Sequence, residues 1–343
     1  MNNNKLNQIA QKLSAQPKGI LAADESTNTI KKRFYTINLE SNFENRRKYR
    51  ELLFKTANLN KFISGIILFD ETLKQSTSEG VPFGSYLTNI GILPGIKVDT
   101  GAVPLTTDSS EKFTEGLDGL SKRLDTYKEL GAVFTKWRAI ISIDEKSKIP
   151  SDYIIELNAY TLARYAKVVQ ENGLVPIVEP EVLMDGEHSI EKCFQVTSKT
   201  LECLFEKLAV HSVRLDGILL KPNMIISGKK SKSQASISEV ASMTVECLKE
   251  NVPPEVPGIV FLSGGQSDKI ATEHLNEMNK SFKNLPWNLS FSYGRALQQP
   301  TLLSWGGKEN KVLDSQNALF NRSKLNSIAT LGEYSNELEN PSA

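Results

Sequence analysis

The chain has 343 residues, of which 39% are hydrophobic and 24% charged, and its 41 Lys and Arg almost balance its 40 Asp and Glu. This composition is typical of a globular protein, and the net charge of +1 provides no overall field to attract nucleic acid or a membrane surface, so we expect neither as a partner. Three scattered histidines and three cysteines have no spacing typical of a metal site, and we expect no metal and no cofactor.

Short apolar runs alternate with helical patterns along most of the chain. A helical pattern at residues 4–16 ends at Pro17 and precedes the first of eight predicted strands. We expect the strands at residues 19–24, 62–69, 95–99, 132–138, 174–179, 216–221, 258–263 and 289–293. We expect the clearest helices between them at residues 46–57, 151–172, 189–211, 236–250 and 267–281. Such alternation predicts parallel strands covered by helices.

Eight strand–helix units predict an α/β fold of the closed (β/α)8 TIM-barrel type, which takes about 250 residues. We expect a single domain over residues 1–343, with the barrel core at about 19–306 and a C-terminal extension and tail at 307–343. An open doubly wound sheet is the alternative, but no G-x-G-x-x-G follows the first strand. The Lys- and Ser-rich segment 227–236 is predicted to be an exposed loop, and residues 333–343 a mobile tail.

The N-terminus has neither the apolar core of a signal peptide nor the Arg and Ser bias of a transit peptide. The longest apolar run, at residues 62–69, is too short to span a bilayer. We therefore expect a cytoplasmic protein without a membrane segment.

The predicted strand at residues 216–221 carries a lysine at its far end, directly before Pro222. Its stem should lie among aliphatic side chains and its amine at the mouth of the strand. Burial and a neighbouring cation favour the neutral form of such an amine, which then attacks carbonyl groups. The simpler interpretation is a lysine that extends from the end of a core strand into solvent. This strand alone leaves both interpretations open.

Charged residues gather at or near the C-terminal ends of five predicted strands, and active sites of barrels are built at that end. These residues are Asp24, Lys97, Lys136, Arg138, Glu179, Glu181 and Lys221. Because strand side chains alternate with period two, Lys136 and Arg138 point the same way, as do Glu179 and Glu181. Seven charges on otherwise apolar strands predict an active site rather than a solvated rim.

Six segments resemble, in order and in register, class I fructose-bisphosphate aldolase of the animal and plant type. They are residues 17–26 (PKGILAADES), 136–138 (KWR), 175–181 (VPIVEPE), 219–224 (LLKPNM), 261–266 (FLSGGQ) and 291–296 (FSYGRA). The resemblance extends from about residue 5 to about residue 330. It implies a metal-independent lyase of glycolysis and gluconeogenesis, which reversibly cleaves fructose 1,6-bisphosphate into dihydroxyacetone phosphate and glyceraldehyde 3-phosphate. It also implies a homotetramer.

The resemblance implies a catalytic role for four residues. Lys221 matches the lysine that forms a Schiff base with the sugar, and Glu179 matches the general acid/base. Lys136 matches a group that handles the carbinolamine, although a structural ion pair with Glu181 would also explain it. Asp24 matches the carboxylate near the carbon-4 hydroxyl, although it could instead cap the following helix. We expect apolar neighbours to raise the pKa of Glu179, so that it holds a proton near neutrality.

A sugar bisphosphate needs two anion sites. The segment after the seventh strand and that after the eighth match the carbon-1 phosphate site, where barrels bind phosphate through loop amides and a helix N-terminus. The matching residues are Ser263, Gly264, Gly265, Ser292, Gly294 and Arg295. The residues that match the carbon-6 phosphate side are Lys97, Arg138, Ser26, Thr29 and Arg33. Arg33 has a simpler interpretation as part of a charged helix face, and Glu181 is expected to orient the lysine.

Two alternatives to this function stay open at the level of sequence. One is a related Schiff-base aldolase that prefers another sugar phosphate, such as sedoheptulose 1,7-bisphosphate, and the other is a scaffold without catalysis. The chain also departs from the eukaryotic members, which end in a tyrosine that speeds proton exchange on the enamine. Here the last tyrosine is Tyr334, and Thr29 stands where many relatives have serine.

Overall fold

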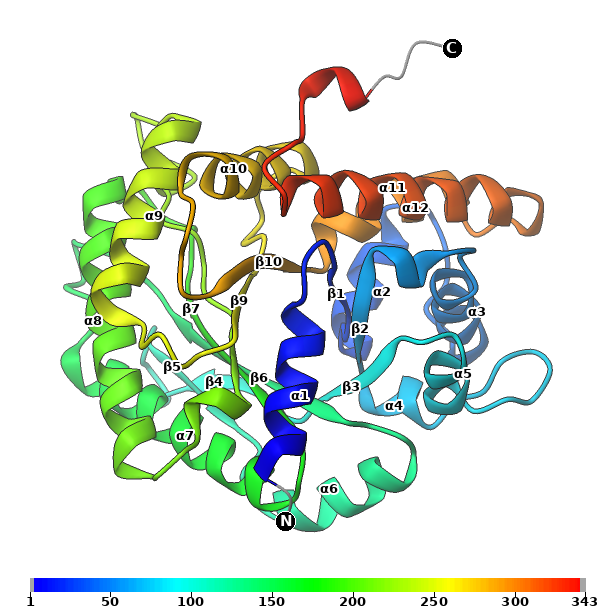
Figure 1. Ribbon diagram of the computed structural model, residues 1–343, viewed down its shortest axis with the longest axis horizontal. Helices are drawn as coiled ribbons and strands as arrows, with labels where there is room; N and C mark the ends of the chain where they lie inside the picture. Colours follow the sequence, from blue (N-terminus) through cyan, green and yellow to red (C-terminus); the bar gives the residue numbers. More distant parts are fainter. Residues whose placement is uncertain (1–2, 340–343) are drawn as a thin grey trace.

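Eight parallel strands close into a barrel in the computed structural model, which describes residues 3–339 (Figure 1). Each strand pairs with its predecessor and successor among the barrel strands, and β1 closes the ring against β10. The barrel strands are β1 (Gly19–Ala23), β2 (Ile63–Leu68), β3 (Leu93–Lys97), β6 (Phe134–Ile141), β7 (Val175–Val182), β8 (Leu219–Leu220), β9 (Gly258–Phe261) and β10 (Asn288–Tyr293). The predicted TIM barrel is confirmed.

Helices follow the barrel strands and surround them (Figure 1). They are α1 (Asn3–Ser14), α2 (Thr27–Tyr35), α3 (Phe43–Phe54), α4 (Asp70–Leu73), α5 (Phe83–Asn89), α6 (Leu120–Glu129), α7 (Asp152–Glu171), α8 (Ile190–Val210), α9 (Ile237–Asn251), α10 (Asp268–Ser281), α11 (Arg295–Trp305) and α12 (Val312–Ala329). Short 3-10 turns are η1 (Leu59–Lys61), η2 (Leu215–Gly217), η3 (Glu309–Lys311) and η4 (Asn336–Glu339). Between residues 3 and 339, every helix is too short or too polar to cross a membrane.

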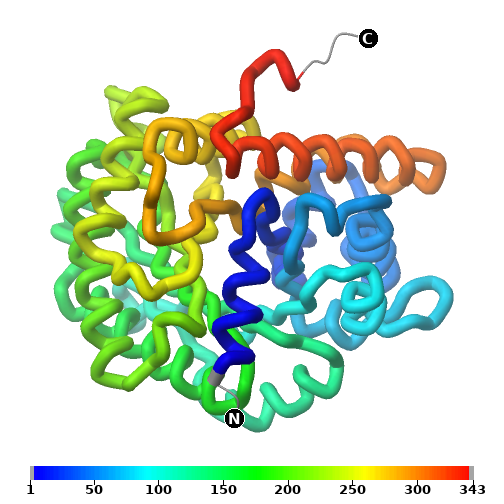
Figure 2. Tube along the Cα trace, in the orientation of Figure 1, coloured from blue at the N-terminus to red at the C-terminus, as the bar shows by residue number. Residues whose placement is uncertain are grey.

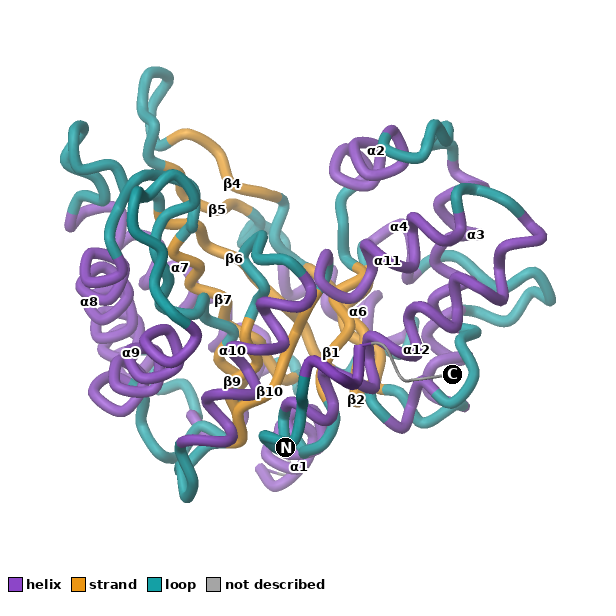
Figure 3. The backbone as a smooth tube through the Cα atoms, turned by 90° about the horizontal axis from the view of Figure 1, so that it is seen from above, coloured by secondary structure: helices purple, strands orange, loops and turns teal. Residues whose placement is uncertain are grey.

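The N-terminal helix α1 closes one end of the barrel. Its apolar residues Leu6, Ala10 and Leu13 belong to the same buried cluster as the inward-facing side chains of the strands, including Phe134. The Ser64 hydroxyl on β2 donates to the Leu13 carbonyl at 2.6 Å, which fixes the end of α1 against the barrel. Figure 3 shows α1 at one end of the strands, with α2 and the β4–β5 hairpin at the other. The functional face is therefore the end opposite α1.

The inward-facing residues of these strands are apolar near α1 and charged two positions further along the strand. Phe134, Ile177 and Leu219 lie in the interior cluster next to α1. Two residues further along the same three strands stand Lys136, Glu179 and Lys221, which must point inward as well. On β1, Ala22 is followed in the same way by Asp24. The charged residues therefore form a layer above an apolar floor.

Strand β8 is much shorter than the predicted strand at residues 216–221. Residues 215–217 form the turn η2, and only Leu219 and Leu220 pair as a strand. The Lys221 N–H still donates to the Val178 carbonyl at 2.8 Å. Pro222 then has no N–H to donate, so the ladder toward β7 ends at Lys221. The lysine consequently stands at the last fixed position of its strand.

Other differences from the expected elements concern a hairpin, the ends of two barrel strands and one loop. An antiparallel hairpin of β4 (Gly101–Pro104) and β5 (Lys112–Glu115) follows β3, and nothing in the sequence analysis predicted it. Strand β6 extends to Ile141 and β7 to Val182, three residues beyond the expected ends, which places their second charged residue inside the strand. The segment 227–236 is exposed from residue 229 onward, whereas its first two residues are buried.

Residues 333–339 are held on the protein rather than forming the expected mobile tail. Helix α12 packs against α10 and α11 (Figure 2). The Tyr334 side chain beyond it is buried, and its hydroxyl donates to the Glu339 carboxylate at 2.6 Å. Glu339 in turn accepts two hydrogen bonds of 2.8 Å from the buried Arg322 guanidinium. The rest of that prediction, residues 340–343, lies outside the described residues.

Candidate active site

A cavity of about 800 Å³ opens at the C-terminal ends of the strands. It is lined by all sixteen residues that the sequence analysis assigned to a site, from seven of the eight barrel strands and the segments that follow them. They are Asp24, Ser26, Thr29, Arg33, Lys97, Lys136, Arg138, Glu179, Glu181, Lys221, Ser263, Gly264, Gly265, Ser292, Gly294 and Arg295. The structure thus brings the predicted residues to one place.

At the floor of the cavity, two ammonium groups and two carboxylates form a chain of ion pairs. Lys136 Nζ lies 2.7 Å from Asp24 Oδ2 and 3.2 Å from Glu179 Oε2. Lys221 Nζ lies 3.2 Å from Glu179 Oε1. The side chains of both lysines and of Glu179 are only 4% exposed. Glu179 therefore bridges two buried amines, one through each of its oxygens.

The opposite charges in this group of ion pairs keep one another ionised, although burial favours the neutral forms. Burial alone would raise the pKa of Asp24, but Lys136 and Lys221 hold the pKa of this carboxyl well below its usual range. Burial alone would likewise lower the pKa of Lys136, but Asp24 and Glu179 raise it above the ordinary lysine value. Lys136 is therefore a permanent cation and Asp24 a permanent carboxylate near neutral pH.

The expected protonation of Glu179 is wrong for the ligand-free site. Burial raises the pKa of this carboxyl, as predicted, but the positive charges of Lys136, Lys221 and Arg138 outweigh it and the pKa is lowered. The sequence shows the apolar neighbours of Glu179 along its own strand. The cations come from β6 and β8 on either side, and only the closed sheet brings them within reach. Glu179 is consequently ionised before substrate binds.

The alternative ion pair between Lys136 and Glu181 does not form. Glu181 instead pairs with the Arg138 guanidinium, nearer the mouth, where the Arg138 side chain is 42% exposed. Strands β6 and β7 run parallel, so a two-residue step moves both side chains up by one level. The deeper amine accordingly meets Glu179, and the outer guanidinium meets Glu181. The expectation that Glu181 orients the lysine is wrong for the same reason.

Two further cations, Lys97 and Arg33, line the cavity, and each is already paired with a carboxylate. Lys97 Nζ bonds the Asp99 carboxylate and, at 2.8 Å, the Asp99 carbonyl. Arg33 bonds the Glu25 carboxylate. Ser26 caps α2 by accepting from the Thr29 N–H at 3.4 Å, so this helix cap falls to Ser26 and not to Asp24.

The two carboxylates that hold these cations were not predicted. Asp99 stands two residues after Lys97 at the end of the same apolar run, and its charge alone could have suggested it. Glu25 accepts from Arg33 and also lies 2.6 Å from the buried Arg50 guanidinium. It follows Asp24 directly, and no spacing in the sequence distinguishes it.

The segments after β9 and β10 offer uncharged donors around Arg295. The backbone of Gly264 and Gly265 is left-handed, with φ of +55° and +89°, a conformation that favours glycine. Arg295 begins α11, whose first turn leaves N–H groups without helical partners. The Ser292 hydroxyl lines the cavity, is almost fully buried and has no hydrogen-bond partner among the described residues. A buried, unpartnered hydroxyl beside free amides suits an anion.

An amine buried beside carboxylates at the C-terminal end of a barrel equips a protein to form imines with carbonyl substrates. The chain is similar to known proteins of this kind. Its residues 5–343 match the class-I fructose-bisphosphate aldolase family, and the chain therefore belongs to that family. Members of this family are lyases that need no metal. Within residues 3–339, no group of three or more His, Cys, Asp or Glu is placed to hold a metal ion.

Individual relatives agree over almost the whole chain. The chain is 54% identical over 330 residues to a probable fructose-bisphosphate aldolase class 1 of Xanthomonas axonopodis pv. citri, which covers 96% of this chain and 98% of the relative. It is 53% identical over 322 residues to the cytosolic fructose-bisphosphate aldolase 4 of Arabidopsis thaliana, with 94% and 81% covered. A crystal structure of fructose-bisphosphate aldolase from Plasmodium falciparum superposes with a TM-score of 0.95 at 50% identity, covering 97% and 95%.

Proposed function

We propose that this cavity cleaves fructose 1,6-bisphosphate through a Schiff base between Lys221 and carbon 2 of the sugar. The observation that carries the proposal is the Glu179 carboxylate, which lies 3.2 Å from Lys221 Nζ and equally close to a second, permanent ammonium. A buried lysine with a base at this distance can give up its proton without releasing it to water.

Glu179 and Lys221 can supply and accept every proton that imine formation requires. Glu179 takes a proton from the Lys221 ammonium, and the neutral amine adds to the carbon-2 carbonyl to give a carbinolamine. The protonated Glu179 then returns its proton to the carbinolamine hydroxyl, which leaves as water and yields the iminium ion. Glu179 thus becomes an acid by receiving the proton of Lys221, so a raised pKa in the free enzyme is not required. Lys136 keeps Glu179 ionised at the start and holds it in place.

Cleavage then moves an electron pair into the iminium. The carbon-4 hydroxyl loses its proton, the bond between carbons 3 and 4 breaks, and the pair passes through carbon 3 to leave an enamine and free glyceraldehyde 3-phosphate. The Asp24 carboxylate accepts the proton of the carbon-4 hydroxyl in this step. Because Lys136 lowers its pKa, Asp24 is a weak base, and stabilising the cationic iminium is its larger contribution.

Two groups of anion-binding residues in one cavity suit a substrate with a phosphate at each end. We assign the carbon-1 phosphate to Ser292, Arg295 and the amides of residues 263–265. We assign the carbon-6 phosphate to the side with Lys97, Arg138, Arg33, Ser26 and Thr29. The cations of that side are released from their carboxylates when the phosphate, a stronger acceptor, arrives.

Borohydride reduction in the presence of dihydroxyacetone phosphate tests the proposal. The reduced imine should add the mass of the reduced adduct to a single peptide that contains Lys221, and activity should be lost in parallel. A control with EDTA should leave turnover unchanged. Label on another lysine, or loss of turnover with EDTA, would contradict the proposal.

We further propose that the protein acts in the cytosol as a homotetramer of single-domain subunits. Support for the compartment comes from the Arabidopsis relative, whose name includes cytosolic, and support for the tetramer comes from the family resemblance alone. Light scattering coupled to gel filtration measures the mass directly. A mass near that of the 38.1 kDa chain would contradict the tetramer.

A further inference from the structure

Lys229, which follows β8 and lines the cavity, has no part in the mechanism above. We propose that its ammonium group binds the carbon-1 phosphate together with Arg295 and the loop at residues 263–265. This inference rests on the proposed function, because it adds a cation to the anion site assigned there.

The backbone of Lys229 is fixed against the loop that connects β7 to α8. Its N–H donates to the Met184 carbonyl at 2.8 Å, and the neighbouring Gly228 N–H donates to the His188 carbonyl at 2.9 Å. A side chain at Gly228 would clash with the Gly186 carbonyl oxygen at 2.6 Å, so glycine permits this close approach. The backbone position of Lys229 is thus fixed, and only its side chain is free to move.

The tip of the side chain lies against the glycine loop. A Cβ built on Gly265 would stand 3.0 Å from Lys229 Nζ and 3.5 Å from Cε. The ammonium therefore occupies the space beside Gly265, in the loop that offers amides to the phosphate. The same lysine leaves no room for a side chain at residue 265, in addition to the left-handed φ there.

The charge balance of this anion site calls for another cation. A phosphate monoester carries about 1.5 to 2 negative charges at pH 7, whereas Arg295 supplies one positive charge. The Arg33 guanidinium also lies near Gly294, but its charge is already balanced by Glu25. Lys229 has an acidic neighbour in Asp185, but Nζ and Oδ1 are 3.6 Å apart, too far for a hydrogen bond, and the two side chains are 43% and 71% exposed. So loose a contact leaves the ammonium available to a phosphate, which binds it more strongly.

The kinetics of the condensation reaction test whether Lys229 binds the carbon-1 phosphate, because each of the two substrates carries only one phosphate. In Lys229→Ala, we expect the KM for dihydroxyacetone phosphate to rise about 5- to 20-fold, the KM for glyceraldehyde 3-phosphate to stay within about 2-fold, and kcat to stay within about 3-fold. Lys229→Arg should restore most of the affinity. The matched control is Lys230→Ala, since Lys230 is the exposed neighbour and does not line the cavity.

A second measurement does not depend on turnover. The concentration of dihydroxyacetone phosphate that gives half-maximal borohydride trapping on Lys221 should rise by the same factor in Lys229→Ala, with complete trapping at saturation. An unchanged half-saturation, a rise in KM for glyceraldehyde 3-phosphate instead, or an equal effect in Lys230→Ala would each overturn the inference. Failure of the proposed function is recognised separately, as absence of Lys221 label in the unsubstituted protein.

Discussion

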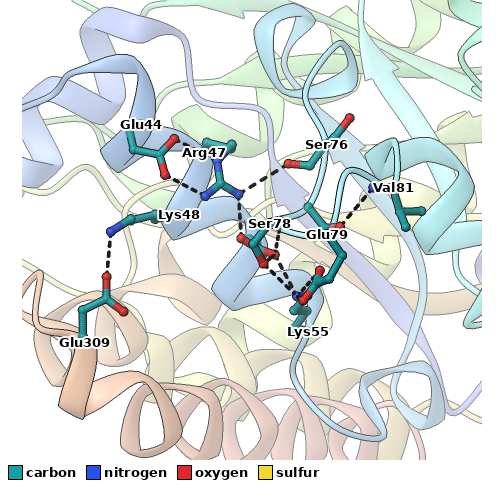
Figure 4. Close-up of polar contacts among 11 residues, drawn as sticks. Glu44, Arg47, Lys48, Lys55, Ser76, Ser78, Glu79, Val81 and Glu309 are labelled. Atoms are coloured by element: carbon teal, nitrogen blue, oxygen red, sulfur yellow. Dashed lines mark hydrogen bonds and ion pairs between the residues drawn. The ribbon is translucent and has the colours of Figure 1, made fainter.

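The molecule contains two dense networks of ion pairs, one that includes exposed carboxylates and one that is buried throughout. On α3 and the loops beside it, Arg47 bonds Glu44 and Glu51, and Lys55 bonds Glu51 and Glu79 (Figure 4). Most of these pairs are three or four residues apart on one helix, and the Glu44 and Glu79 side chains are more than half exposed.

In the barrel, by contrast, four charged residues from four strands meet where each side chain is 4–12% exposed. A surface pair can be broken and its partners solvated by water, whereas a buried charge that loses its partner has no replacement. The comparison indicates that the α3 network can lose a member at small cost, whereas the four buried residues of the barrel (Asp24, Lys136, Glu179 and Lys221) depend on one another.

The largest expected effect comes from removing the reactive amine. Lys221→Ala should lower kcat by at least about 10⁴-fold, because no imine can form. Glu179 keeps Lys136 as its partner, so the melting temperature should fall by only a few degrees. Steady-state kinetics and calorimetry measure both, and a variant that retained a tenth of the activity would contradict the role of Lys221.

Removing the other amine of the chain should damage both stability and catalysis. Lys136→Met leaves Asp24 without its closest cation, and the loss of one partner from a buried pair costs about 3–5 kcal/mol of unfolding free energy. We expect kcat to fall about 10²- to 10⁴-fold as well, since Glu179 is no longer held ionised and in place. Urea unfolding and initial rates measure the two effects. Native-like stability in this variant would remove the distinction between the two networks.

Acid should weaken the buried ion pairs of the barrel and so lower the unfolding free energy. The pKa values of Asp24 and Glu179 are lowered in the folded protein, so their stabilisation is complete above their unfolded values near 4 and is lost as the pH falls below them. Asp24→Asn should therefore show a flatter decline of unfolding free energy between pH 5 and pH 3 than the unsubstituted protein. Equal slopes in urea titrations at these pH values would show that Asp24 carries none of the effect.

A matched substitution in the α3 network should cost less. Burial raises the pKa of Glu51, but its bonds to Lys55, to the Ser78 N–H at 2.7 Å and to Arg47 at 2.6 Å outweigh burial and lower the pKa to about 2. Glu51→Gln should lower the unfolding free energy by about 1–2 kcal/mol, because the amide still occupies the site but loses its charge. Turnover should be unchanged within about 2-fold. A loss as large as that of Lys136→Met would mean that the α3 network is equally intolerant.

The smallest effect on catalysis is expected at the C-terminal end. The Tyr334 hydroxyl is bonded to Glu339 and does not line the cavity, so deletion of residues 333–343 should change cleavage turnover less than about 3-fold. The same deletion leaves the buried Arg322 without Glu339 and should lower stability. We also expect slow proton exchange on the enamine, measured as loss of tritium from dihydroxyacetone phosphate. A collapse of cleavage activity would place a catalytic group in this segment.

The sequence alone determined the eight-strand alternation and the end of the barrel at which function lies. Period two fixes which residues of a strand share a face, so Lys136 with Arg138, and Glu179 with Glu181, could be assigned to the cavity without a structure. The strand pattern likewise placed Lys221 at the mouth of the barrel. These inferences succeeded because they depend on local geometry.

The tertiary structure alone decided which charges meet. Lys136 pairs with Asp24 and Glu179 rather than with Glu181, and this choice reverses the expected protonation of Glu179. It also brings Lys229 to Gly265 and fastens Glu339 to Arg322. The physical reason is that a pKa depends on charges within a few ångströms in space, and in a closed barrel most of those charges come from other strands.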